Sequence, residues 1–290
     1  MSALLDRHAQ AEEDVPTRAE DVGSVRAHVL QRIAATRPGT EPFRHLNIEQ
    51  VLPDAFYEQL RAHMLAVKAG GRSDKSKSAP GRVSIMECDD PAVATFRAVF
   101  SDPSVIKALV AKFYIDPAAV MESGLTIHDR LEYTFVKAGR FQNIHVDIPP
   151  KYLSFVFYIP ECTELTEEEE LANATLLYDE KLQPRPCLRF RRNTVCVFAP
   201  HFRSYHGYAS TRDREALVMF YSNPEELAKW KEVRLAQGDV APFTAVRDWI
   251  EDKLRRHPLI ELGRDQELLR REREACRVNG EQGFVLTDRR

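Results

Sequence analysis

The sequence predicts an α+β protein in which helices at both ends of the chain buttress a β-sandwich or barrel-like sheet. From Gly124 to Asn223, apolar and β-branched residues come in short runs separated by Pro, Gly or Asn, which is typical of short strands joined by turns. Before and after that region, apolar residues recur with helical spacing. The 290 residues divide accordingly into an N-terminal helical extension (1–40), a β domain with flanking helices (41–223) and a C-terminal helical extension (224–290).

Helical spacing is clear in the first half of the chain. The expected helices cover Val22 to Ala35, a segment that follows the turn at Pro53, Ala92 to Phe100, and Ser104 to Phe113. In the second of them we expect Asp54 as N-cap, and one stripe carries Phe56, Leu60, His63 and Met64. The Gly-, Ser- and Lys-rich segment 69–82 is predicted to be a mobile loop.

The strand candidates lie in the middle of the chain. Their sequences are "LTIHDRLEYTFVKAG", "YLSFVFYIP", "ATLLY", "NTVCVFAP" and "ALVMFYS". Helical spacing returns in Pro224 to Gly238 and in Thr244 to Arg256. The segment from Leu259 to Arg277 is dense in Glu and Arg, which indicates a solvated helical face and not a binding patch.

The composition excludes several classes of protein. Charged residues make up 29% of the chain with a formal net charge of -3, whereas a nucleic-acid binder usually has a basic excess. No segment approaches the ~20 uninterrupted apolar residues that span a bilayer, and residues 1–15 lack the apolar run of a signal peptide. The five cysteines are scattered and form no CxxC pair, which indicates reduced thiols in a cytoplasmic protein.

The segment "FQNIHVDIPP" (141–150) carries the first candidate site residues. His145 and Asp147 are two residues apart, so on an extended backbone both side chains point to the same face. A second histidine elsewhere would complete a set of two imidazoles and one carboxylate, which holds iron(II) on one side and leaves the opposite side open. An isolated HxD triplet is also compatible with a simple pair at a strand end.

The segment 193–223 supplies the rest of such a set. His206 follows the buried-looking strand Val195 to Phe198, and Arg214 opens the apolar run "REALVMFY". A buried arginine needs an anionic partner, and its planar guanidinium suits bidentate binding of a carboxylate.

With these residues in place, segment 130–222 resembles the prolyl-4-hydroxylase-like branch of the iron(II)/2-oxoglutarate-dependent oxygenases. That family has a glycine before HxD, an apolar strand ending in Tyr-Leu or Tyr-Ile, a strand ending in Phe, a distal histidine followed by a small residue, and a basic residue that opens the last strand. The corresponding positions here are Gly139, His145, Asp147, Tyr158-Ile159, Phe198, His206-Gly207 and Arg214. Two positions depart from the pattern: Val136 replaces a frequent tyrosine, and Asn173 to Thr175 replace a Gly-Gly-x-Thr segment.

The resemblance implies a double-stranded β-helix (jelly-roll) core and a dioxygenase that uses iron(II), 2-oxoglutarate and dioxygen. It implies His145, Asp147 and His206 as metal ligands, and Arg214 with Tyr158 as the residues that bind the distal carboxylate of 2-oxoglutarate. The retained Asp147 implies hydroxylation or another oxidation, since related halogenases replace this carboxylate. We expect a small-molecule substrate, such as an amino acid or a specialised metabolite, before a protein side chain, and neither nucleic acid nor a membrane as partner.

Several alternatives stay open at the level of sequence. His201 could replace His206 as ligand, and Arg212 could replace Arg214 as carboxylate binder. Adjacent residues His128 and Asp129 would point to opposite faces of a strand and cannot both bind one metal from it. Arg140 and Asn143 flank the metal strand and could contact substrate or be ordinary loop residues.

Two other classes of protein compete with the oxygenase. A cupin-type metal enzyme would not need Arg214 or 2-oxoglutarate, but cupins usually carry HxH, which this chain lacks. A catalytically silent binding protein could have kept the fold. The C-terminal helices could form a lid or a homodimer surface.

Overall fold

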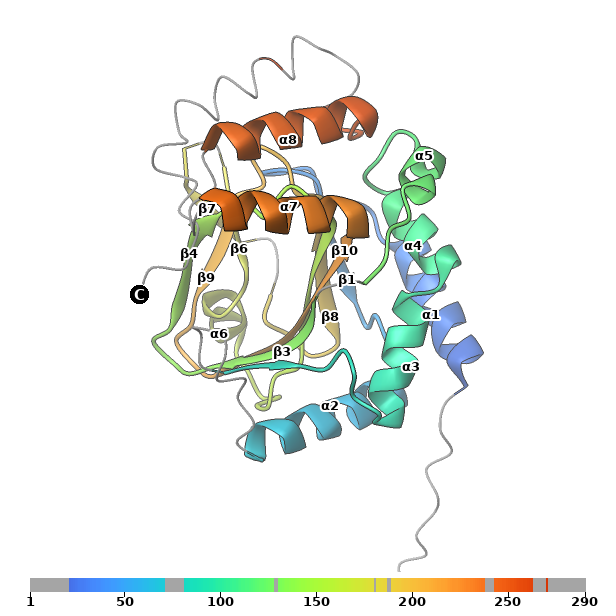
Figure 1. Ribbon diagram of the computed structural model, residues 1–290. Helices are drawn as coiled ribbons and strands as arrows, with labels where there is room; N and C mark the ends of the chain where they lie inside the picture. The colour runs from blue at the N-terminus through green and yellow to red at the C-terminus, as the bar shows by residue number, and fades with distance from the viewer. Residues whose placement is uncertain are drawn as a thin grey trace, which may run out of the picture.

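The computed structural model describes residues 21–70, 81–127, 130–179, 181–186, 189–237, 243–262 and 270. Within them, two antiparallel sheets form a sandwich, and helices surround it (Figure 1). The larger sheet has the strand order β1 (His45–Glu49), β8 (Thr194–Phe198), β5 (Lys151–Tyr158), β10 (Arg214–Ser222), β3 (Leu131–Val136) and β2 (Arg82–Ser84). The smaller sheet has the order β4 (Phe141–His145), β9 (His206–Ala209), β6 (Leu176–Tyr178) and β7 (Pro184–Pro186).

The larger sheet is buried on both faces. On β5, Phe155 and Phe157 belong to the main core, and Phe157 packs edge-on against Phe96 at a ring distance of 5.0 Å. Tyr158, next along the strand, lies in a second, smaller apolar cluster with Leu177 of β6. Since successive side chains of a strand point to opposite faces, one face of β5 meets the helices and the other meets the smaller sheet.

The helices pack mainly around the larger sheet. In chain order they are α1 (Val22–Ala35), α2 (Asp54–Ala69), α3 (Pro91–Phe100), α4 (Pro103–Val110), α5 (Pro117–Glu122), α6 (Glu167–Ala172), α7 (Pro224–Gln237) and α8 (Phe243–Arg256). In Figure 1, α1, α3, α4 and α5 stack along one side of the sandwich, and α7 and α8 lie side by side at one end of it. The N-terminal extension shares the main core, because Val25, Val29 and Ile33 of α1 are buried in it.

The helix starts follow a repeated local signal. In α3, α4 and α5 an aspartate side chain accepts hydrogen bonds from the first-turn amides and a proline follows it directly. Aspartate is a good N-cap, and proline at the first helical position has no amide to satisfy. Asp90, Asp102 and Asp116 therefore set the starts of these helices. As a result, α3 and α4 begin at Pro91 and Pro103, one residue before the starts expected from the sequence.

Most sequence predictions of secondary structure are confirmed. The structure has the helix at Val22–Ala35 and strands in all five apolar runs. The prediction of Asp54 as N-cap is wrong: Pro53 has the extended backbone of a capping residue, Asp54 is already helical, and no side chain caps α2. The helix expected to reach Phe113 ends at Val110. Residues 71–80 and most of 259–277 lie outside the described residues.

No helix among the described residues is long and apolar enough to cross a membrane.

Candidate metal centre

The three predicted ligands come from two neighbouring strands of the smaller sheet. His145 is the last residue of β4, and His206 is the first residue of β9. The strands pair antiparallel with His145 directly opposite His206, and Asp147 follows two residues after β4. The strand pairing therefore brings together residues that are 61 positions apart in the sequence.

The side chains of His145, Asp147 and His206 converge on one point. Their candidate ligand atoms all lie within 4.8 Å of one another. The two imidazole rings are 4.2 Å apart, and Nε2 of His206 is 3.7 Å from Oδ2 of Asp147. Asp147 and His206 are buried, whereas His145 is half-buried.

The surroundings set the protonation of His206. Its Nδ1 donates a hydrogen bond to the Ser204 carbonyl at 3.0 Å, which directs Nε2 toward Asp147. Burial lowers the pKa of His206 below its usual value, although the charge of Asp147 opposes this shift. A neutral imidazole with one nitrogen held by a carbonyl is the form that binds metals.

Asp147 is held in place by two side chains of β5. Its Oδ1 forms a buried ion pair with Nζ of Lys151, and its Oδ2 accepts a hydrogen bond of 2.7 Å from Ser154. Burial alone would raise the pKa of Asp147, but the charge of Lys151 lowers it far below its usual value, and His206 and His145 add to this effect when they are protonated. The carboxylate is thus ionised, and the oxygen that faces His206 is the one not paired with Lys151.

This donor set fits iron(II). Two neutral imidazoles and one ionised carboxylate on one side form the set that binds non-haem iron(II) and leaves positions open opposite to it. Residues that hold such ligands from behind usually tune them as well. Ser204, Lys151 and Ser154 are in that position here.

Arg214 lies inside the sandwich and is only 3% exposed. Its guanidinium donates to Thr175 Oγ1 at 2.9 Å, to the Asn173 carbonyl at 3.2 Å and to the Tyr158 hydroxyl at 3.5 Å. All of these acceptors are neutral. Within the part of the chain that the structure describes, no carboxylate pairs with Arg214. A buried guanidinium without an anion is costly, so this place suits a carboxylate ligand.

Tyr208 connects Arg214 to the metal ligands. The Arg214 guanidinium lies over the Tyr208 ring at 4.2 Å from its centre. Tyr208 is two residues after His206 on β9, so their side chains share a face about 7 Å apart along the strand. Arg214 and the triad therefore face the same space between the sheets.

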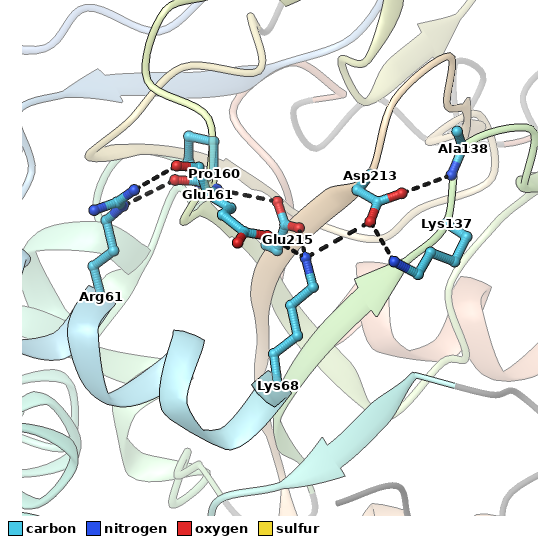
Figure 2. Close-up of polar contacts among 8 residues, drawn as sticks. All are labelled: Arg61, Lys68, Lys137, Ala138, Pro160, Glu161, Asp213 and Glu215. Carbon is cyan, nitrogen blue, oxygen red and sulfur yellow. Dashed lines mark hydrogen bonds and ion pairs between the residues drawn. The ribbon is translucent and has the colours of Figure 1, made fainter. Parts of the chain in front are cut away.

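The residues next to Arg214 are fixed by a polar cluster, shown in Figure 2. Lys68, near the end of α2, lies 2.6 Å from Glu215 Oε1 and 2.6 Å from Glu161 Oε2. Asp213 accepts from Lys137 Nζ at 2.7 Å and from the Ala138 amide at 3.1 Å. Both neighbours of Arg214 in the sequence are thus held from outside the sandwich.

The same cluster holds the end of β5. Arg61 of α2 donates to the carbonyls of Pro160 at 2.9 Å and Glu161 at 2.6 Å (Figure 2). This segment directly follows Tyr158-Ile159. The helix α2 therefore fixes both strands that carry the residues proposed for the distal carboxylate.

The structure separates the alternatives that the sequence left open. His201 forms an ion pair with Glu261 at 3.1 Å, and it is not a member of the triad cluster. Arg212 is 43% exposed and pairs with Glu169 at 2.6 Å, whereas Arg214 is buried. Arg140 is exposed. His128, Asp129 and the side chain of Asn143 lie outside the described residues.

Sequence reasoning missed Gln142 and Lys151. A bulge between Gln142 and His145 adds one residue to β4, so Gln142 shares a face with His145 despite their odd spacing. Its Nε2 lies 3.2 Å from Nε2 of His145. Lys151 opens the buried strand "KYLSFVFY", and the argument that singled out Arg214 at the start of β10 could have found it.

The motif glycine and the replaced Gly-Gly-x-Thr segment also have clear local roles. Gly139 has a φ of +80°, a left-handed conformation that favours glycine, in the turn before β4. Its amide donates to the Ser210 carbonyl at 2.7 Å. The substitute segment Asn173–Thr175 contributes the carbonyl and the hydroxyl that hold Arg214.

The C-terminal helix α8 supports both segments that carry the ligands. Nζ of Lys253 is buried and donates to the carbonyls of Pro149 at 3.0 Å, Lys151 at 2.8 Å and Pro200 at 3.1 Å. Pro149 and Lys151 follow Asp147, and Pro200 lies in the loop before His206. The C-terminal region is therefore packed behind the site.

Neither a protein-family model nor a curated protein sequence matches this chain. Among solved structures, a prolyl 4-hydroxylase from Phytophthora capsici is similar, with 15% identity, a TM-score of 0.50, and coverage of 91% of this chain and 90% of that chain. A Pseudomonas putida prolyl-4-hydroxylase has 15% identity and a TM-score of 0.46, and covers 68% of this chain and 98% of that chain. A prolyl hydroxylase from Trichoplax adhaerens has 11% identity and a TM-score of 0.46, and the match covers 71% of this chain and 93% of that chain.

The protein thus has the fold of the prolyl-4-hydroxylase-like oxygenases. The expected α+β class with a jelly-roll core and flanking helices is confirmed, and so is the resemblance at the level of the fold. The described residues add a His-Asp-His cluster inside this fold.

Proposed function

We propose that this protein is an iron(II)- and 2-oxoglutarate-dependent dioxygenase that hydroxylates, or otherwise oxidises, an unactivated C–H bond of a small molecule. The observation that carries the proposal is Arg214, a buried cation that faces the same space as the triad and whose hydrogen-bond partners among the described residues are all neutral. A cupin-type enzyme would have no use for it. A dicarboxylic acid between the triad and Arg214 would satisfy both.

The residues of the site have separate tasks in this proposal. His145, Asp147 and His206 hold the metal, and Lys151 and Ser154 hold Asp147 in its ionised form. Arg214, with Tyr158 beside it, binds the distal carboxylate. An iron(II) ion bound there supplies the chemistry that couples decarboxylation of 2-oxoglutarate to oxidation of a C–H bond.

The burial of the site supports a small substrate. Asp147 and His206 are only 6% and 7% exposed, so a large partner has little access to the metal position. An amino acid or a specialised metabolite remains our proposal, with a protein side chain second. Succinate release from amino acids and metabolites, compared with release from peptides, tests this choice, and release with peptides alone would contradict it.

The cofactor proposal has a direct test. Protein loaded anaerobically with iron(II) is titrated with 2-oxoglutarate while the weak visible charge-transfer absorption of a chelated keto acid is recorded. Arg214→Met should raise the Kd of 2-oxoglutarate about 10- to 100-fold, since a hydrogen-bonded charged partner contributes roughly 1.5–3 kcal/mol. Iron affinity should stay unchanged.

Arg212, two residues before Arg214, provides a matched control variant. Arg212 is exposed and paired with Glu169, so Arg212→Met should bind 2-oxoglutarate like the unchanged protein. The absence of the absorption band, or equal binding by both variants, would refute the proposal.

A further inference from the structure

A second group of chemically active side chains lies where α2 and α3 meet, at the lower edge of Figure 1. Nδ1 of His63, on α2, is 2.9 Å from Oδ2 of Asp90. Nε2 of the same ring is 3.5 Å from Sγ of Cys88, which lies in the turn between β2 and α3. None of the elements involved carries a member of the metal triad.

The three side chains form a nucleophile, a base and a group that orients the base. Asp90 is fixed because its Oδ1 accepts from the amides of Ala92 at 2.9 Å and Val93 at 3.3 Å. Its Oδ2 holds Nδ1–H of His63, which leaves Nε2 free to take the thiol proton. Hydrogen-bonded Cys–His pairs with a third orienting group activate sulfur as a nucleophile.

The position of Cys88 allows small reagents to reach it. Cys88 is half-buried, and the side chains of His63 and Asp90 are 25% and 26% exposed. Small electrophiles can therefore reach the Cys88 sulfur at the point where it contacts His63.

We propose that Cys88 is a reactive thiol, activated by His63 and oriented by Asp90, and a modification site for soft electrophiles and hydrogen peroxide. With an alkyl halide, the thiol proton passes to His63 Nε2, the S–C bond forms and the halide leaves. With hydrogen peroxide, the S–O bond forms as the O–O bond breaks. Sulfur is oxidised to the sulfenic acid, and the other peroxide oxygen leaves as water with the proton from His63.

The chain offers an internal reference. Cys162 is an exposed thiol whose Sγ accepts a hydrogen bond from Arg212 at 3.6 Å, and none of its contacts among the described residues is a histidine. If exposure alone governed reactivity, Cys162 would react faster than Cys88. If the His63 contact governs it, the order reverses.

The experiment measures alkylation by iodoacetamide at each cysteine of the full chain by peptide mass spectrometry at neutral pH. Cys88 should react about tenfold faster than Cys162. His63→Gln should slow Cys88 about tenfold and leave Cys162 unchanged. Asp90→Asn, which can still cap α3, should slow Cys88 to a smaller extent.

A second reagent checks the oxidation. Exposure to hydrogen peroxide followed by dimedone should label Cys88 in the unchanged protein and not in His63→Gln. Circular dichroism verifies that each variant is folded. Equal alkylation rates at Cys88 and Cys162, or an unchanged Cys88 rate in folded His63→Gln, would overturn the proposal.

Discussion

Replacing Lys68 by Met should damage both the stability and the co-substrate site. Lys68 Nζ pairs with Glu215 and Glu161, each at 2.6 Å (Figure 2). The Glu215 side chain is 2% exposed, whereas that of Glu161 is 61% exposed. Without Lys68, the described residues leave Glu215 only the Glu161 amide, at 3.3 Å.

The size of the effect follows from that burial. Removing one partner of a buried ion pair costs about 3–5 kcal/mol. Lys68 is 16% exposed, so water screens part of the remaining charge, and we expect a loss of about 2–3 kcal/mol in the free energy of unfolding. Because Glu215 follows Arg214 directly, the Kd of 2-oxoglutarate should also rise about tenfold.

Urea unfolding and 2-oxoglutarate titration measure the two effects. In a Glu215→Gln background, Lys68→Met should lower the free energy of unfolding by about 1–2 kcal/mol less, because the buried charge of Glu215 is then absent. Lys137→Met is the matched control: Lys137 is 75% exposed and pairs with Asp213, so its loss should stay within about 0.5 kcal/mol. Equal losses for Lys68→Met in both backgrounds would refute the reasoning.

Two further changes probe single contacts. Tyr158→Phe removes a hydroxyl that lies 3.5 Å from Arg214. The Kd of 2-oxoglutarate, measured by calorimetry, should therefore rise about fivefold, which corresponds to ~1 kcal/mol. A parallel loss of iron affinity would contradict this role of Tyr158. Hydrogen bonds from Ser104 and Arg26 lower the pKa of Asp102 from 3.8 to about 2. The resulting stabilisation, about 1 kcal/mol because the pair is solvent-screened, should be present above the unfolded-state pKa and lost as the pH falls toward 2. Urea unfolding should show this loss of stability in the unchanged protein but not in Asp102→Asn. An equal pH dependence of stability in both proteins would exclude a contribution from Asp102.

The parts of the site that the sequence predicted rest on local rules. The spacing of His145 and Asp147 places both on one face wherever the backbone is extended. Arg214 at the start of an apolar strand needs an anion wherever that strand is buried. Neither rule requires knowledge of the three-dimensional arrangement. The structure brings His145 and Asp147 together with His206, and it places Arg214 inside the sandwich against Tyr208 of β9.

Two of the contacts that the sequence did not predict depend on features that no local rule contains. The bulge that turns Gln142 toward His145 is one extra residue in β4, and it exists only relative to the register of β9. The contact of His63 with Cys88 joins residues 25 positions apart through the packing of α2 against the β2–α3 turn. Lys151 is different, since it obeys the same rule as Arg214 and could have been predicted.

Lys151 and Arg214 are both buried cations of the site, but they differ in whether the protein itself supplies an anionic partner. Lys151 is paired with Asp147 in the protein itself, so its charge is already balanced and serves to keep that ligand ionised. Among the described residues, Arg214 contacts hydroxyl, carbonyl and aromatic groups, and in our proposal its charge is balanced by the carboxylate of the co-substrate. If Lys151 bound the co-substrate instead, Asp147 would lose its partner and Arg214 would remain uncompensated. If Arg214 binds the co-substrate as we propose, the same burial that makes its charge costly to the free protein would strengthen carboxylate binding. Binding of the co-substrate would then also stabilise the fold.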